Sequence, residues 1–251
     1  MIKEKNRETI ISAATGKEPV DILFTNAKVI NVFTGEILEQ SVAVKEGYIC
    51  GFGNYDAVRR VDLEGMYVAP GLMDSHVHIE SSMVTPVQFS RGVLPFGTTT
   101  VIADPHEIAN VLGTRGIEYM VQSAEKSTMN ILFSMPSCVP ATDMETTGAT
   151  LNAEAIAPFM QNNRIVALAE MMNYPGVISA DSQVMAKIKA AHKIRKPVDG
   201  HAPGVSGRDL WAYAAAGISS DHECTTTQEA LEKLRLGMHI MVREGTCAKK
   251  S

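Results

Sequence analysis

The sequence has little of what marks secreted, membrane-spanning or nucleic-acid-binding proteins. Its four cysteines form no CxxC pair, which favours free thiols in a reduced cytoplasmic protein over a disulfide framework. No apolar run approaches the ~18 residues that a membrane span needs, and residues 1–19 lack the apolar segment of a secretory signal. There is no basic block and the net charge is −5, so we expect no nucleic-acid or membrane partner.

The composition is that of a packed globular protein. Of 251 residues, 45% are hydrophobic and 20% are charged, which supplies apolar material for a sizeable core and argues against global disorder. This length permits one large domain, or one large and one small domain.

The pattern of the chain changes twice, and each change predicts a domain boundary. Residues 1–19 are expected to form a polar, partly helical lead-in. Residues 20–67 are rich in Val, Ile, Phe and Thr, with turn signals at TGE, KEG and GN, and predict a small β-domain of antiparallel strands and hairpins. From 68 to 251, strand-like and helix-like segments alternate, which predicts a parallel α/β fold, a (β/α)8 barrel.

Two details of the barrel region are predicted from the same pattern. Residues 107–127 have the spacing of a helix, and residues 226–237 that of another, with Thr226 or one of its neighbours as N-cap and Gly237 just beyond the C-terminus. Only six or seven strands can be counted, the last at 238–243. We therefore expect the barrel to be incomplete at its C-terminus.

Polar side chains gather at the predicted C-terminal ends of the strands. In chain order they are His76 and His78, Asp104 and His106, Glu170, His201, and His222. In a barrel these ends meet at one mouth, where such enzymes place their active sites. Imidazole and carboxylate ligands suit a divalent metal such as Zn, Fe, Mn or Co.

The spacing of these residues favours two metal ions. Side-chain direction repeats every two residues along a strand, so His76 and His78 can bind one ion together. Glu170 has two oxygens and can bridge to a second ion held by His201 and His222. A binuclear centre of this kind can activate water at neutral pH for attack on an electrophilic carbon.

Some of these residues have plainer interpretations. An HxH pair alone is weak evidence for a metal, and it is the shared position after apolar runs that favours a site. Asp104 can simply cap the helix that follows it. Cys224 is more typical of a small buried side chain than of a ligand, and the EMMN segment at 170–173 is more typical of packing than of binding.

Several segments resemble a known family. PGLMDSHVHIESSM, at residues 70–83, is similar to the PGxxDxHxH strand-1 signature of the amidohydrolase superfamily, and FTNAKVINVFTGE resembles the opening of its small β-domain. HIESS, DPHEIANV and AEMMNYPGV are more specific, and DGHAPGVSGRDLWAY matches as well. Together they resemble the bacterial adenine deaminases, over about residues 20–248.

The resemblance implies a cytoplasmic enzyme of purine salvage that hydrolyses adenine to hypoxanthine and ammonia. It implies a binuclear centre of Mn or Fe, which can also hold Zn, and a homo-oligomer, a dimer, at full length. The implied metal ligands are His76, His78, His201, His222 and the bridging Glu170; the implied catalytic residues are Glu170 and His222; and a role in the pocket or toward substrate is implied for Asp104, His106, Glu107 and Glu223.

One residue that the family uses is missing. An aspartate after strand 8 binds metal and carries protons in these enzymes, and no candidate follows Glu244. We therefore expect this chain to be an N-terminal portion without normal activity.

Two alternatives stay open. The first is an amidohydrolase that opens a cyclic amide, as dihydroorotases and hydantoinases do, although these usually place a carboxylated lysine where this chain has Glu170. The second is a non-catalytic fragment, which would expose apolar surface where strands 7 and 8 close the barrel.

Overall fold

The computed structural model describes residues 4–142 and 144–243, and the chain divides into two compact units, Met1–Gly71 and Leu72–Ser251. Each unit has a hydrophobic core of its own. Among the described residues, no helix combines the length and the apolar character needed to cross a membrane.

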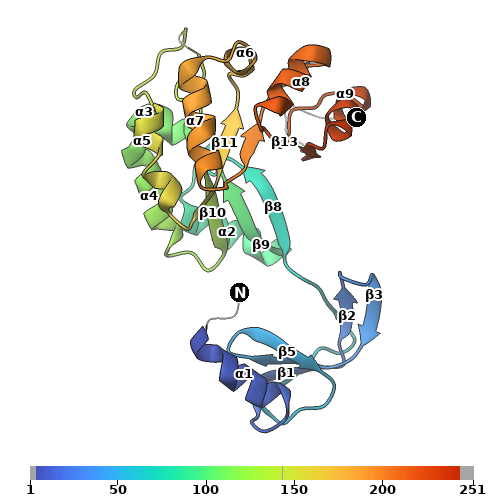
Figure 1. The fold of residues 1–251 in the computed structure, drawn as a ribbon. Coiled ribbons are helices and arrows are strands. Elements are labelled where there is room, and N and C mark those ends of the chain that lie inside the picture. Colours follow the sequence, from blue (N-terminus) through green and yellow to red (C-terminus); the bar gives the residue numbers. More distant parts are fainter. Residues whose placement is uncertain (1–3, 143, 244–251) are drawn as a thin grey trace. The chain divides into compact units, whose positions relative to one another are not determined.

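The first unit contains two small β-sheets and the helix α1, which is preceded by a 3-10 turn (Figure 1). One sheet has the strand order β5-β4-β1-β6 and the other β3-β2-β7. The elements are η1 (Glu4–Asn6), α1 (Arg7–Ala14), β1 (Val20–Thr25), β2 (Lys28–Asn31), β3 (Glu36–Glu39), β4 (Val42–Lys45), β5 (Tyr48–Phe52), β6 (Ala57–Asp62) and β7 (Tyr67–Val68).

The predicted hairpins are present in this unit. β4 and β5 are joined by Glu46 and Gly47, whose φ angles of 53° and 77° are those of the two-residue turn that matches strand twist. β2 and β3 form the second hairpin, around the TGE signal.

The prediction of antiparallel pairing is wrong for two strand pairs. β6 pairs with β1 and β7 pairs with β2, both in parallel. In each case at least one hairpin separates the partners along the chain, and such a long connection lets a strand return in the same direction. Strand composition carries no information on that choice.

The second unit is a curved wall of parallel strands covered by helices (Figure 1). Its elements are β8 (Leu72–Val77), η2 (Glu80–Ser82), α2 (Pro86–Val93), η3 (Leu94–Phe96), β9 (Thr98–Ala103), α3 (His106–Leu112), α4 (Thr114–Ala124), β10 (Asn130–Met135), α5 (Ala153–Ile156), η4 (Phe159–Gln161), β11 (Ile165–Met171), α6 (Tyr174–Ile178), α7 (Ser182–Lys193), β12 (Val198–Gly200), α8 (Gly207–Ala215), β13 (Ser220–Asp221), α9 (Thr227–Arg235) and β14 (His239–Ile240).

The strands of this wall follow one another in chain order. β8 to β12 form a five-stranded parallel sheet, β13 and β14 pair in parallel, and a single bridge between Val198 and Ile218 links the two groups. The central strands β10 and β11 are almost wholly buried and have nearly continuous apolar sequences, because helices such as α4 and α7 cover their outer face. The architecture is the predicted α/β barrel, with seven strands among the described residues.

The helix after β9 is interrupted, contrary to the prediction of one helix at 107–127. α3 ends at Leu112 and α4 begins at Thr114, with Gly113 between them at φ 60° and ψ −141°. This conformation is essentially restricted to glycine, so Gly113 separates two helices that share one apolar pattern. The predicted cap of the last helix is confirmed, because the Thr226 hydroxyl accepts a hydrogen bond from the backbone N–H of Glu229.

The wall is open at the edges formed by its first and last strands. Within the part of the chain that the structure describes, β8 pairs only with β9 and β14 only with β13. A cleft of about 910 Å³ lies between these edges. Leu72, Met73 and Val242 line it and are 64%, 66% and 88% exposed. These residues are the apolar surface that an unclosed barrel leaves.

Gly200 lets β13 approach β12 closely, and its replacement is predicted to disturb the wall. A Cβ atom at this position would lie 2.3 Å from the backbone oxygen of Ser220. We expect Gly200→Ala to lower the free energy of unfolding by about 1–3 kcal/mol, the usual cost of overpacking. Gly92→Ala, in α2 with open space around the added methyl, is the control and should be neutral or stabilising. Urea unfolding of both variants measures the difference, and equal stability would contradict the steric argument.

Candidate metal centre

The predicted site centres on Glu170, near the end of β11. Its side chain is 3% exposed and is surrounded by imidazoles from four other strand ends. Strand β8 contributes His76 and the following loop His78; His106 follows β9; His201 and His222 follow β12 and β13. The two histidines outside the predicted set, His192 and His239, lie in α7 and β14 and have no part in the cluster.

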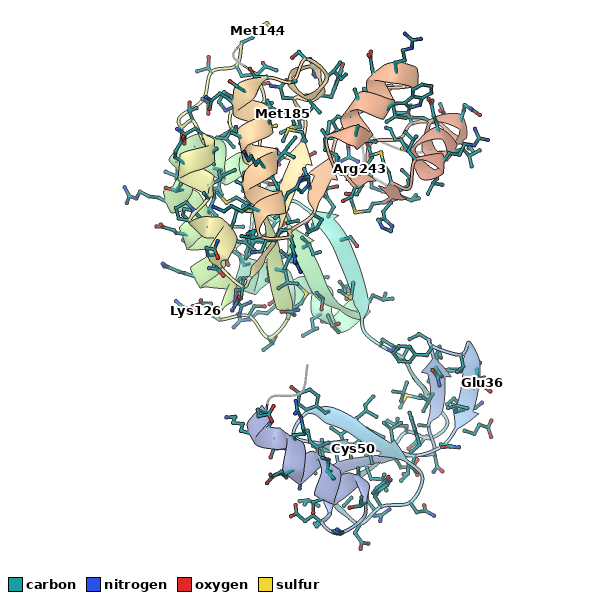
Figure 2. The ribbon with its side chains drawn as sticks, viewed as in Figure 1. Glu36, Cys50, Lys126, Met144, Met185 and Arg243 are labelled. Carbon is teal, nitrogen blue, oxygen red and sulfur yellow. The ribbon has the colours of Figure 1, made fainter. Side chains whose placement is uncertain are left out.

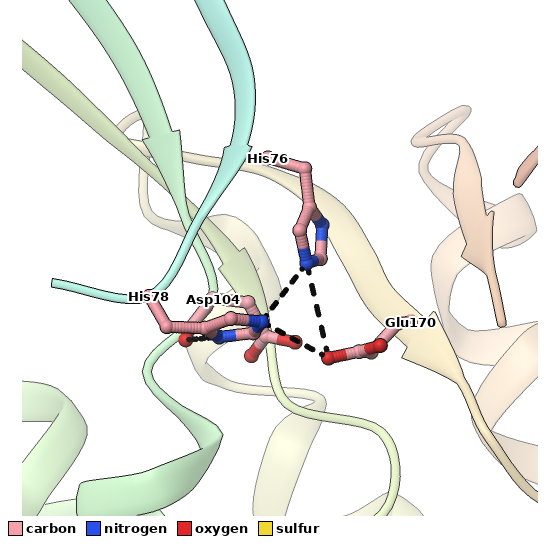
Figure 3. A group of neighbouring side chains, drawn as sticks. All are labelled: His76, His78, Asp104 and Glu170. Carbon is pink, nitrogen blue, oxygen red and sulfur yellow. Dashed lines mark hydrogen bonds and ion pairs between the residues drawn. The ribbon is translucent and has the colours of Figure 1, made fainter. Parts of the chain in front are cut away.

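One side of the cluster is formed by the two histidines of the HxH pair (Figure 3). The Nε2 atoms of His76 and His78 are 3.1 Å apart and lie 3.8 Å and 3.4 Å from Oε1 of Glu170. His78 Nδ1 lies 3.0 Å from the backbone oxygen of Asp104, and His76 Nδ1 lies 2.9 Å from a carboxylate oxygen of Asp199. Both of these oxygens can only accept, so each Nδ1 carries the proton.

This proton assignment leaves electron pairs facing one another. In neutral histidines with Nδ1 protonated, both Nε2 atoms are acceptors, and both are directed toward Oε1 of Glu170. Three acceptors at these distances repel one another unless a cation or proton lies between them. The geometry therefore fits a bound cation.

The other side of the cluster uses the second oxygen of Glu170. Oε2 lies 2.5 Å from His201 Nδ1 and 3.0 Å from His222 Nε2. The candidate ligand atoms of Glu170, His201 and His222 lie within 4.8 Å of one another, as do those of His76, His78, Asp104 and Glu170. Imidazole nitrogen and carboxylate oxygen are the usual ligands of divalent transition metals, so the residues present fit two such ions.

The charges in the cluster stabilise one another. Burial would raise the pKa of Glu170, but hydrogen bonds from His201 and His222 outweigh it and hold that pKa far below its usual range. Burial opposes protonation of His222, yet its contacts with Asp199 and Glu170 raise the pKa of His222 to about 9. The metal-free site thus holds protonated imidazole around an ionised carboxylate.

His106 and Asp104 lie together beside this cluster. His106 Nδ1 is 3.2 Å from Oδ2 of Asp104 and 3.3 Å from Oε1 of Glu170. These contacts outweigh burial and raise the pKa of His106 to about 9. The interpretation of Asp104 as a helix cap is wrong, because α3 begins after Pro105 without a side-chain cap.

The two remaining predicted residues lie farther out. The Glu107 carboxylate accepts a hydrogen bond of 2.5 Å from the Ser81 hydroxyl. Glu223 Oε1 lies 3.9 Å from His222 Nε2 and 2.6 Å from Nη2 of Arg243, which follows β14 (Figure 2). Arg243 and His222 both line the cleft. The thiol side chain of Cys224 is buried, as predicted.

Asp199 is a member of the site that sequence reasoning missed. Its Oδ2 lies 2.9 Å from His76 Nδ1 and 3.6 Å from His222 Nδ1, and its Oδ1 accepts a hydrogen bond of 2.6 Å from the Ser220 hydroxyl. It therefore contacts a histidine from each side of the cluster. The signal was available, because Asp199 precedes His201 by two residues and so shares its face of the strand.

The first prediction concerns the number of protons released when metal binds. Because the pKa of His222 is about 9 without metal, metal binding at neutral pH must displace its proton. We expect Mn²⁺ to release about one more proton from the native chain than from His222→Gln at pH 7.5, and metal affinity to rise with pH up to about 9. The pH change in weak buffer measures this, and identical release from both would contradict it.

The raised pKa of His222 also makes the stability of the metal-free fold depend on pH. A histidine whose folded pKa exceeds its unfolded value of about 6.5 stabilises the fold below pH 6.5, and this contribution is lost as the pH rises to about 9. The metal-free chain should therefore become easier to unfold in urea across this range, and His222→Gln should show a weaker dependence.

The second prediction concerns Asp199. Carboxylates behind metal-binding histidines typically contribute 10–100-fold to metal affinity. We expect Asp199→Asn to weaken binding by about that factor at both sides of the cluster, since its carboxylate contacts His76 and His222. Ser220→Ala, which removes only the support of Asp199, should have a smaller effect. Chelator competition measures both, and unchanged affinity in Asp199→Asn would exclude this role.

Comparison with known proteins agrees with the geometry. The profile of the "Amidohydrolase family" matches residues 67–250. An adenine deaminase of Desulfatibacillum aliphaticivorans is 57% identical over 242 residues, which are 96% of this chain and 42% of the relative. An adenine deaminase of Methanothrix thermoacetophila is 51% identical over 96% of this chain and 43% of the relative. The chain thus spans less than half the length of these curated relatives.

Solved structures share the fold at low sequence identity. An N-acyl-D-glutamate deacylase from Bordetella bronchiseptica, complexed with zinc and a phosphonate inhibitor, superposes with a TM-score of 0.60 at 15% identity, over 89% of this chain and 58% of that one. An atrazine chlorohydrolase from Arthrobacter aurescens TC1, complexed with zinc, gives 0.58 at 13% identity, over 87% and 70%. By its sequence, its fold and its strand-end histidines, this chain belongs to the amidohydrolase family.

Proposed function

We propose that this chain is the N-terminal part of an adenine deaminase, which converts adenine and water to hypoxanthine and ammonia. The observation that carries the proposal is the convergence of the acceptor atoms of His76 and His78 on Glu170, beside an open cleft. The 57% identity to an adenine deaminase over 96% of this chain supports the choice of substrate.

We propose that His76 and His78 hold one ion, that His201 and His222 hold a second, and that Glu170 bridges the two. The separate contacts of the Glu170 oxygens support this, since Oε1 is directed at the first pair and Oε2 at the second. Manganese or iron is the proposed metal, with zinc as an alternative. Two divalent ions at this place would supply an activated water at neutral pH.

The remaining residues serve binding and proton movement in this proposal. Ammonia must leave protonated, so a group has to carry a proton from water to the exocyclic nitrogen of adenine. Glu170 and His222 are proposed to be catalytic as ligands of the ions that would activate water, since their Oε2 and Nε2 atoms lie 3.0 Å apart and metal would displace the proton between them. Glu223 is held by Arg243 beside the cleft and is proposed to contact the purine. Asp104, His106 and Glu107 are proposed to shape the pocket.

The proposal extends to the whole protein. We propose a cytoplasmic, dimeric enzyme of purine salvage, in which residues 20–67 form the N-terminal part of a composite β-domain and residues 68–251 the first part of the barrel. A strand that follows this region would close the cleft between β8 and β14 and supply the proton-shuttling aspartate. The cyclic-amide alternative is disfavoured by Glu170, which stands where that group carries a modified lysine.

A chimaeric enzyme tests the function. Residues 1–243 would be joined to the C-terminal part of the Desulfatibacillum aliphaticivorans relative, and ammonia release from adenine measured with Mn²⁺. We expect activity, and a loss of at least about 100-fold in His78→Asn and Glu170→Gln, because metal activation of water contributes several kcal/mol. His192→Asn, a histidine outside the cluster, is the matched control and should stay active.

A folded, metal-loaded chimaera that releases no ammonia, measured beside the active relative, would exclude adenine as the substrate of this site.

A further inference from the structure

A lysine on helix α9 is buried without any direct contact to the metal-binding side chains. Lys233 is 0% exposed, although a lysine is almost never fully buried unless its charge is paired. Its Nζ donates a hydrogen bond of 2.8 Å to the backbone oxygen of Ala202 and lies 2.7 Å from Glu229 and 3.1 Å from Asp221. Three acceptors thus satisfy all three of its protons.

Two of these acceptors are sequence neighbours of the second pair of histidines. Ala202 directly follows His201, and Asp221 directly precedes His222. Asp221 Oδ2 also accepts a hydrogen bond of 2.9 Å from the backbone N–H of Ala202. Asp221 therefore binds the N–H of Ala202 and Lys233 binds its carbonyl, so both members of one ion pair hold the backbone at this residue.

Glu229 extends this network to the rest of both loops. One of its oxygens accepts from the backbone N–H of Gly204, in the loop after β12, and the other accepts from the N–H and hydroxyl of Thr225, in the loop after β13. Burial alone would raise the pKa of Glu229, but the hydrogen bond from Lys233 and these backbone contacts lower it to about 2. The carboxylate is thus ionised at neutral pH.

We propose that Lys233 is a positioning residue that sets the spacing of His201 and His222, so that the metal affinity of their half of the site depends on it and that of the His76 and His78 half does not. The effect is expected in one half of the site because of where the contacts of Lys233 lie. His76 and His78 lie on and after β8, and none of the contacts of Lys233 reaches that strand. The inference rests on the proposed binuclear site.

Metal titration of the intact chain tests the proposal. Mn²⁺ binding would be measured by competition with a fluorescent chelator, with His76→Gln and His201→Gln identifying the two halves. In Lys233→Met, which keeps the length of the side chain without its charge, we expect the equivalent lost in His201→Gln to weaken about 10–100-fold, the range seen when support behind ligands is removed. The other equivalent should change by less than about 3-fold.

Two further variants keep the test decisive. Lys45→Met is the matched control, because Lys45 also donates to a loop carbonyl, that of Pro19, and pairs with a carboxylate, that of Asp21, in the unit without a proposed ligand; both equivalents should stay unchanged. Should Lys233→Met fail to fold by circular dichroism, Glu229→Gln keeps the side-chain shape and is expected to weaken the same equivalent by a smaller factor. Mn–Mn spin coupling in the electron paramagnetic resonance spectrum should weaken in parallel.

Equal weakening of both equivalents, or none, would overturn the positioning role. That failure is distinct from failure of the proposed function. If the native chain binds two ions but the chimaera does not act on adenine, adenine is excluded as the substrate. The positioning role of Lys233 is then unaffected.

Discussion

The charge of Glu170 is the constraint on which the site depends. A carboxylate with 3% of its side chain exposed loses its hydration and is stable only beside positive charge or strong donors. Imidazoles supply these without metal, and the same nitrogen atoms are the ones proposed to bind metal. Each ring then needs its own support, which explains why acceptors such as Asp199 and the Asp104 carbonyl stand behind the histidines.

Most of the candidate site could be predicted from sequence for two reasons. Side-chain direction alternates along a strand, and strands that follow one another in the chain lie next to one another in the wall. Once β8 to β13 are recognised as parallel strands in chain order, their C-terminal ends must share one edge, and His76, His201 and His222 must meet there. The break at Gly113 escaped prediction because the apolar spacing of α3 continues into α4. The parallel pairing of β1 with β6 depends on the path of the chain, which local composition does not encode.

The supporting residues were harder to predict because nothing local distinguishes them. Lys233 is one of several charged residues on α9, and nothing in the sequence of that helix distinguishes it from the others. Only the approach of the loops after β12 and β13 turns that position into a buried one. Asp199 was easier to predict, since it shares a strand face with His201. A carboxylate at that position is informative only once His76 is known to lie opposite it.

The hydrogen bonds around Ala202 have a consequence for how metal enters the site. In proteins whose ligands lie on otherwise unfolded segments, binding has to supply the free energy of ordering the chain, and chelation unfolds them. Here the backbone beside His201 and His222 is already fixed by Asp221 and Lys233, at contacts that involve no ligand atom. In the proposed site, little conformational entropy would be left to lose on metal binding, so exchange of one metal for another would proceed on a folded scaffold. The identity of the bound ion would then depend on metal supply and ligand chemistry more than on the folding of the chain.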